Sequence, residues 1–62
     1  MRVFFQDMDT EDVLFTTEEA FAIPNVDESV LIDDTTWYVV TERTFYYRYR
    51  RYSCTVWVKK DV

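Results

Sequence analysis

Short apolar runs alternate with clusters of polar residues along this chain of 62 residues. Runs rich in β-branched and aromatic side chains, bounded by turn-forming residues, are typical of β-strands. The pattern predicts five strands, at residues 2–6, 13–17, 29–32, 37–47 and 53–60. The polar clusters between them, such as 7–12 and 33–36, predict turns.

Residues 10–23 also admit a helical interpretation. Thr10 could cap a helix, and the run TTEEAF contains helix-forming residues. However, the apolar side chains between Val13 and Ile23 scatter around a helical wheel and form no stripe. We therefore favour the strand at 13–17 and leave a short helical turn near residues 17–20 as an alternative.

Glycine is absent from the chain, and the one proline is Pro24. Phosphate-binding loops and dinucleotide-binding motifs need the backbone freedom of glycine, so the sequence argues against both. The turns must instead use Asp, Asn, Ser and Thr, whose side chains hydrogen bond to the nearby backbone. Pro24 lacks an N–H group and therefore marks a break or a sheet edge.

Five short strands separated by turns predict one small all-β domain over residues 1–62. We expect an antiparallel meander that forms a curled sheet or an SH3-like barrel. Strand alternation in the longest run places Trp37, Val39 and Phe45 on one face. The expected core comprises Val3, Phe5, Val13, Phe15, Phe21, Ile23, Val30, Ile32, Trp37, Val39, Phe45, Val56 and Val58.

A chain this short needs support beyond an ordinary core, usually a disulfide, a metal or oligomerisation. The lone cysteine, Cys54, excludes an intramolecular disulfide, and the absence of histidine removes the common zinc ligand sets. We interpret Cys54 as a small buried apolar side chain and expect no metal and no other cofactor. Aromatic packing and oligomerisation are the remaining sources of stability, and the chain has five Phe, five Tyr and two Trp.

The charge is divided unevenly along the chain, whose formal net charge is −5. Residues 1–42 hold eleven acidic residues and one basic residue, whereas residues 43–62 hold six basic residues and one acidic residue. No apolar run approaches the roughly 20 residues that a membrane span needs. The beginning of the chain also lacks an apolar segment of signal-peptide length. We therefore predict a cytoplasmic protein with no membrane partner.

Residues 45–52, FYYRYRRY, bring together four tyrosines and three arginines. Tyr, Trp and Arg are the residues most enriched at binding hot spots. We therefore predict a partner-binding site formed by Tyr46, Arg48, Tyr49, Arg50, Arg51, Tyr52 and Trp57. Unbroken strand alternation would place Tyr46, Arg48, Arg50 and Tyr52 on one mixed face. Alternatively, a hairpin bends within the arginines.

Residues 23–60, IPNVDESVLIDDTTWYVVTERTFYY...CTVWVKK, resemble a pattern of small phage-encoded proteins of unassigned function. In that pattern an Ile-Pro pair precedes a short strand, an Asp-rich turn, a long YVV strand and a closing V-x-V strand. The resemblance implies a phage or prophage origin and a small antiparallel β fold, and it carries over no catalytic residues. Asp27 and the DDTT turn stand where the pattern has glycine.

The sequence favours a binding protein over an enzyme, because acid–base catalysis needs a histidine or positioned carboxylates. No histidine is present, and most carboxylates fall in predicted turns. Our leading hypothesis is an anti-defence protein that inhibits or sequesters a host protein by direct contact. Self-association into a homodimer or larger oligomer would use the same tyrosine-rich strand.

Two alternatives use the same Tyr/Arg segment. An oligomer could act as a sponge that holds a small nucleotide signal between aromatic rings and arginines. The segment could also bind single-stranded nucleic acid, because rings stack on bases and guanidinium groups hold phosphates. The acidic remainder of the chain disfavours a long polyanion.

Overall fold

The computed structural model describes residues 1–18 and 22–61. The strands are β1 (Arg2–Asp7), β2 (Val13–Thr17), β3 (Ser29–Ile32), β4 (Thr36–Arg48) and β5 (Arg51–Lys60). No helix occurs in these ranges, so the all-β prediction of about five strands is confirmed. The suggested helical turn near residues 17–20 lies partly outside the described residues, as does Phe21 of the predicted core.

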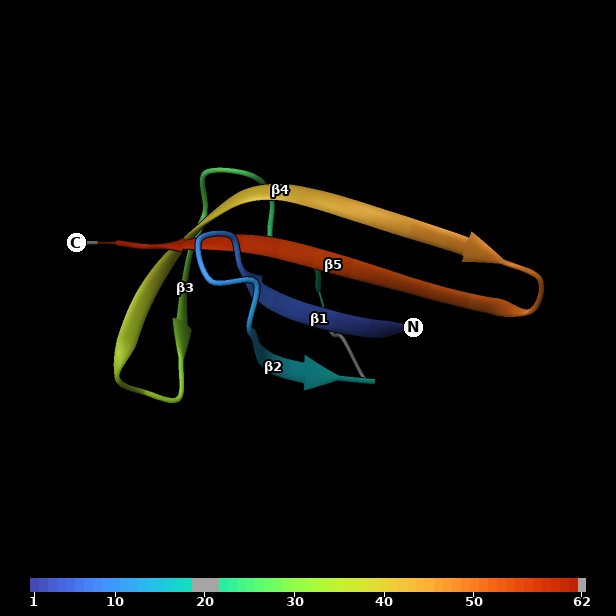
Figure 1. The fold of residues 1–62 in the computed structure, drawn as a ribbon, viewed down its shortest axis with the longest axis horizontal. Helices are drawn as coiled ribbons and strands as arrows, with labels where there is room; N and C mark the ends of the chain where they lie inside the picture. Colours follow the sequence, from blue (N-terminus) through green and yellow to red (C-terminus); the bar gives the residue numbers. More distant parts are fainter. Residues whose placement is uncertain (19–21, 62) are drawn as a thin grey trace.

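The five strands form one sheet in the order β2-β1-β5-β4-β3. Three of the four pairings are antiparallel, whereas β1 and β5 pair in parallel. The first strand therefore lies beside the last one, an arrangement that the local sequence pattern did not predict. The sheet curls so that β3 crosses β5 steeply (Figure 1). The result resembles a small SH3-like barrel that is left open between its edge strands, β2 and β3.

The core lies on the inner face of this curled sheet. Its buried side chains are Val3, Ile32, Tyr38, Val40, Cys54, Val56 and Val58. Phe5, Leu14, Ile23 and Val30 are partly buried and pack against it. The strict alternation of Cys54, Val56 and Val58 along β5 places all three inside, because successive side chains in a strand point to opposite faces.

A β-bulge at Thr41 makes the predicted core stripe of β4 wrong. The register between β4 and β5 shifts just after Val40, so Thr41 is an extra residue. Its hydroxyl donates a hydrogen bond to the carbonyl oxygen of Trp57, at 3.2 Å. Because one extra residue exchanges the two faces of a strand, Tyr38 and Val40 are buried. Trp37, which we expected in the core, is instead 52% exposed.

Three other predicted core residues are also exposed. Val13 and Phe15 lie on β2, which forms an edge of the open barrel and has a neighbour on one side alone. Phe45 lies on the part of β4 that runs past β3, so its ring is 38% exposed. Strand alternation identifies the face on which a side chain lies, but not whether another element covers that face.

Aspartates adopt backbone conformations that usually favour glycine. Asp27, Asp33 and Asp34 have positive φ angles of 75°, 57° and 57°. The N–H group of Thr35 bonds to the carbonyl of Ile32 at 3.3 Å, which places Asp33 and Asp34 at the centre of the turn between β3 and β4. A type I′ turn requires positive φ at both central residues. The predicted use of Asp in turns is therefore confirmed.

Candidate functional site

The Tyr/Arg segment forms the tip of a long hairpin made by β4 and β5. Tyr49 and Arg50 connect the strands, and Arg48 is paired with Arg51. The chain therefore bends within the arginines, which confirms one of the two alternatives that the sequence left open and excludes the other, an unbroken strand through residues 45–52. Arg50 adopts the left-handed conformation, with φ of 60°. Its guanidinium carbon lies 5.0 Å from the centre of the Tyr49 ring.

This bend changes which side chains share a face. Arg51 lies across from Arg48, on the same face as Tyr46, whereas Tyr47 lies across from Tyr52. The rings of Tyr47 and Tyr52 meet edge to face, with centroids 5.8 Å apart. Our expectation that Tyr52 joins Tyr46 and Arg48 is therefore wrong, and Arg51 takes that place.

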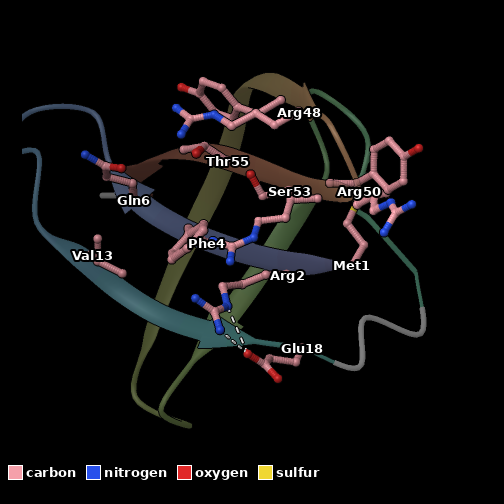
Figure 2. Close-up of a pocket in the computed structure, with 13 residues that line it drawn as sticks. Met1, Arg2, Phe4, Gln6, Val13, Glu18, Arg48, Arg50, Ser53 and Thr55 are labelled. Atoms are coloured by element: carbon pink, nitrogen blue, oxygen red, sulfur yellow. Dashed lines mark hydrogen bonds and ion pairs between the residues drawn. The ribbon is translucent and has the colours of Figure 1, made fainter.

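A groove of about 1050 Å³ lies on the outer face of the sheet, beside the arginines of the hairpin. Figure 2 shows Arg2, Phe4 and Gln6 of β1 next to Ser53 and Thr55 of β5. The hairpin contributes Tyr46, Arg48, Arg50, Arg51 and Tyr52 to the lining. Parallel pairing of β1 with β5 creates the groove, because it places Arg2 opposite Ser53.

The groove is basic, although the chain has a net charge of −5. Arg2, at the edge of the groove, forms an ion pair with Glu18, with Nε and Oε1 2.9 Å apart. In residues 1–18 and 22–61, no ion pair involves Arg48, Arg50 or Arg51. The acid-rich turns at 7–12 and 33–35 lie at the opposite end of the molecule from the hairpin tip (Figure 1). The positive charges of the groove therefore stand apart from the six acidic residues of these turns.

Two of the predicted site residues do not line the groove. Trp57 lies further along β5, opposite Gln6, on the same outer face. Tyr49 stands at the hairpin tip, where it is 85% exposed. In turn, the sequence did not identify Arg2 and Phe4 as site residues. The one signal was that Arg2 is the single base among residues 1–42.

The one thiol of the chain, that of Cys54, is not an activated nucleophile. Burial raises the pKa of the Cys54 thiol, and the positive charge of Arg43 offsets this effect in part. A protonated thiol is a weak nucleophile, and Cys54 is buried as the sequence predicted. The described part of the chain has no cluster of three or more side chains suited to holding a metal ion.

Within residues 1–18 and 22–61 there is no helix with the length and apolar character needed to cross a membrane.

No model of a protein family, no curated protein and no solved structure matches this chain. The resemblance to small phage-encoded proteins therefore stays a prediction. We therefore infer the chemistry of the site from its own side chains. Guanidinium groups bind carboxylates or phosphates. Aromatic rings stack on other rings or bury apolar surface.

Proposed function

We propose that this chain is a small non-enzymatic binding protein that inhibits or sequesters a host protein by direct contact. In this proposal it is a phage-type anti-defence protein that acts in the host cytosol. The observation that carries the proposal is the exposed tyrosine cluster of the hairpin. Tyr47, Tyr49 and Tyr52 are 74%, 85% and 57% exposed, and large aromatic side chains beside arginines are the usual composition of binding hot spots.

The tyrosines are held in place before any partner binds. Cross-strand pairing is regular from Arg43, just past the bulge, to Arg48 and Arg51 at the two-residue tip. The contact between Tyr47 and Tyr52 restricts both rings. Side chains that are already ordered lose less conformational entropy on binding. The hairpin therefore offers a preorganised aromatic surface to a partner.

Affinity purification from host lysate with the tagged chain tests this proposal. A partner identified by mass spectrometry is then purified, and its affinity is measured by calorimetry. We expect Tyr49→Ala/Tyr52→Ala to weaken binding at least about 100-fold, because truncation of two hot-spot aromatics costs about 2 kcal/mol each. The matched control, Leu31→Ala/Trp37→Ala, removes exposed apolar side chains far from the hairpin tip and should keep the wild-type affinity. Equal affinity of the tyrosine variant and the wild type would contradict the proposal.

The groove favours a second candidate function, the binding of a nucleotide or of single-stranded nucleic acid. Its volume of about 1050 Å³ is at the upper end of the range for small-molecule sites. Phe4 and Tyr46 could stack on bases, while Arg50 and Arg51 lie where they could hold phosphates. Unlike the tyrosine cluster, these residues lie on the outer face of the sheet.

Titration of a fluorescent oligonucleotide, together with thermal shift in the presence of cyclic dinucleotides, tests this second function. We expect Arg50→Ala/Arg51→Ala to reduce the slope of log affinity against log salt by about 1.4, or about 0.7 for each lost phosphate contact. The control Lys59→Ala/Lys60→Ala removes two charges outside the groove and should leave the slope unchanged. A slope that is the same in all three proteins would eliminate the nucleic-acid function.

A further inference from the structure

The outer edge of β4 is unpaired over most of its length. β3 pairs with β4 no further than Val39, and the next residue, Val40, bonds to the segment 27–28. From there β4 continues to Arg48, and no strand of the described chain lies along that side (Figure 1). Unpaired N–H and C=O groups on an edge strand are a template for another strand.

The hydrogen bonds of Val40 show which backbone groups point to this edge. Its N–H donates to the carbonyl of Glu28 at 2.9 Å, and its carbonyl accepts from the N–H of Asp27 at 2.8 Å. Both polar groups of Val40 therefore point away from β5. In an antiparallel ladder, residues whose backbone groups point to one neighbour alternate with residues whose groups point to the other.

The bulge at Thr41 shifts this alternation by one residue. Thr41 and Glu42 together face Trp57 across the ladder, and the regular pairing resumes at Arg43. Consequently, Arg43, Phe45 and Tyr47 direct their N–H and C=O groups toward the free edge. These three residues provide six unpaired backbone groups to a strand that docks there.

We propose that this edge pairs with β4 of a second copy of the chain, antiparallel, about a two-fold axis at Phe45. In this register Phe45 lies opposite Phe45 of the second copy. Arg43 lies opposite Tyr47, and Glu42 lies opposite Arg48, each twice in the dimer. The outward-pointing residues of one copy then meet those of the other, so every free N–H and C=O group finds a partner.

The side chains of this edge complement one another in that register. Opposite charges and aromatic pairs directly across an antiparallel ladder are stabilising, and like charges are destabilising. Within the described residues, Glu42 and Arg48 have no ion-pair partner. A slip by two residues in either direction keeps the backbone bonds in phase but separates Glu42 from Arg48. One of these slips brings Glu42 opposite Arg50, but Arg50 lies in the turn beyond the end of β4, so the charges within the strand select one register.

The dimer would place the two grooves side by side. A two-fold axis that relates antiparallel neighbours runs perpendicular to the sheet, so the outer faces of both copies point in the same direction. Tyr46 and Arg48 of the two copies would then line one continuous basic surface. This interface does not depend on the proposed function, because it uses the edge of the hairpin and leaves Tyr49 and Tyr52 uncovered; Tyr47 belongs to both surfaces.

Sedimentation equilibrium of charge-reversed variants tests the interface. Glu42→Arg and Arg48→Glu each place like charges across the two-fold axis, so each should raise the dimer dissociation constant more than about 10-fold. Mixing the two variants restores opposite charges at both positions, and the heterodimer should form with nearly the wild-type constant. Arg50→Glu makes the same charge change outside the paired segment and should leave the wild-type constant intact.

Two outcomes would overturn the proposal. A wild-type chain that stays monomeric at several hundred micromolar has no such interface. A dimer that survives both single reversals, or a mixture that associates no better than either variant alone, uses another surface. Circular dichroism of each variant verifies that the fold is kept.

Discussion

Deletion of Val39 should remove much of the stability of the chain, whereas deletion of Thr41 should leave it folded. Val40 lies opposite Val58 and Glu42 lies opposite Trp57, so removal of the extra residue between them leaves a regular ladder in which both halves of β4 keep their faces. Removal of Val39 exchanges the faces of the residues before it, so that Tyr38 turns to solvent and Trp37 turns inward. Burial of a large apolar side chain contributes about 1.5–3 kcal/mol. Its loss is a large part of the roughly 3–9 kcal/mol that a domain of this size has in total.

Thr41→Ala is the matched control for the deletion of Thr41. It keeps the extra residue and loses the side-chain hydrogen bond to the Trp57 carbonyl, at 3.2 Å. Loss of one such bond costs about 0.5–1.5 kcal/mol, so this variant should fold and melt several degrees lower. Circular dichroism in the near and far ultraviolet distinguishes the two outcomes. A Val39 deletion that melts close to the wild type, or a Thr41 deletion that unfolds, would contradict the bulge at Thr41.

A second large loss of stability is expected on substitution of Val40 but not of Trp37. Strand alternation predicts the burial of these two residues of β4 in the wrong order. Val40 is fully buried, whereas Trp37 is 52% exposed. Val40→Asp places a carboxylate without a partner in the core, at a cost of several kcal/mol, so we expect an unfolded chain. Trp37→Asp introduces the same charge at a solvated position and should change the free energy of unfolding by about 1 kcal/mol.

Urea unfolding followed by circular dichroism measures both variants against the wild type. Strand alternation in the sequence places Trp37 inside. It therefore predicts that Trp37→Asp destabilises the chain more than Val40→Asp does. A folded Val40→Asp variant, together with an unfolded Trp37→Asp variant, would restore the predicted stripe and exclude the bulge at Thr41.

The hairpin has three surfaces with different chemistry, and variants of each surface test a different proposal. The exposed tyrosines carry the proposed contact with a host protein, and the arginines of the outer groove carry the alternative with a nucleotide or single strand. The free edge of β4 carries self-association. Tyr49, Arg51 and Glu42 belong to different surfaces, so single variants separate these functions.

The positions of the strands followed from the sequence because their signals are local. The runs around Phe15, Val30 and Val56 are β-branched and aromatic, and short polar residues end each run. The need for Asp in turns followed from the absence of glycine, and Asp33 and Asp34 adopt the expected left-handed conformation. These properties belong to neighbouring residues and need no knowledge of the whole fold.

Some features of the hairpin required the tertiary structure, because no local signal marks them. Nothing in the sequence distinguishes Thr41 from the threonines around it, yet its extra position determines which face of β4 is buried. Similarly, Tyr49 and Arg50 are not turn formers, but pairing of the strands on both sides forces the bend between them.

An all-β chain, the positions of its strands and a Tyr/Arg-rich segment with the composition of a contact surface could all be predicted from the residues alone. The arrangement of that segment required the tertiary structure. It bends the segment into a hairpin, places the Tyr47–Tyr52 pair on the opposite face from the Arg48–Arg51 pair and adds Arg2 and Phe4 from β1 to the groove. Such pairing between the first and last strands depends on contacts across the whole chain, which no local pattern records.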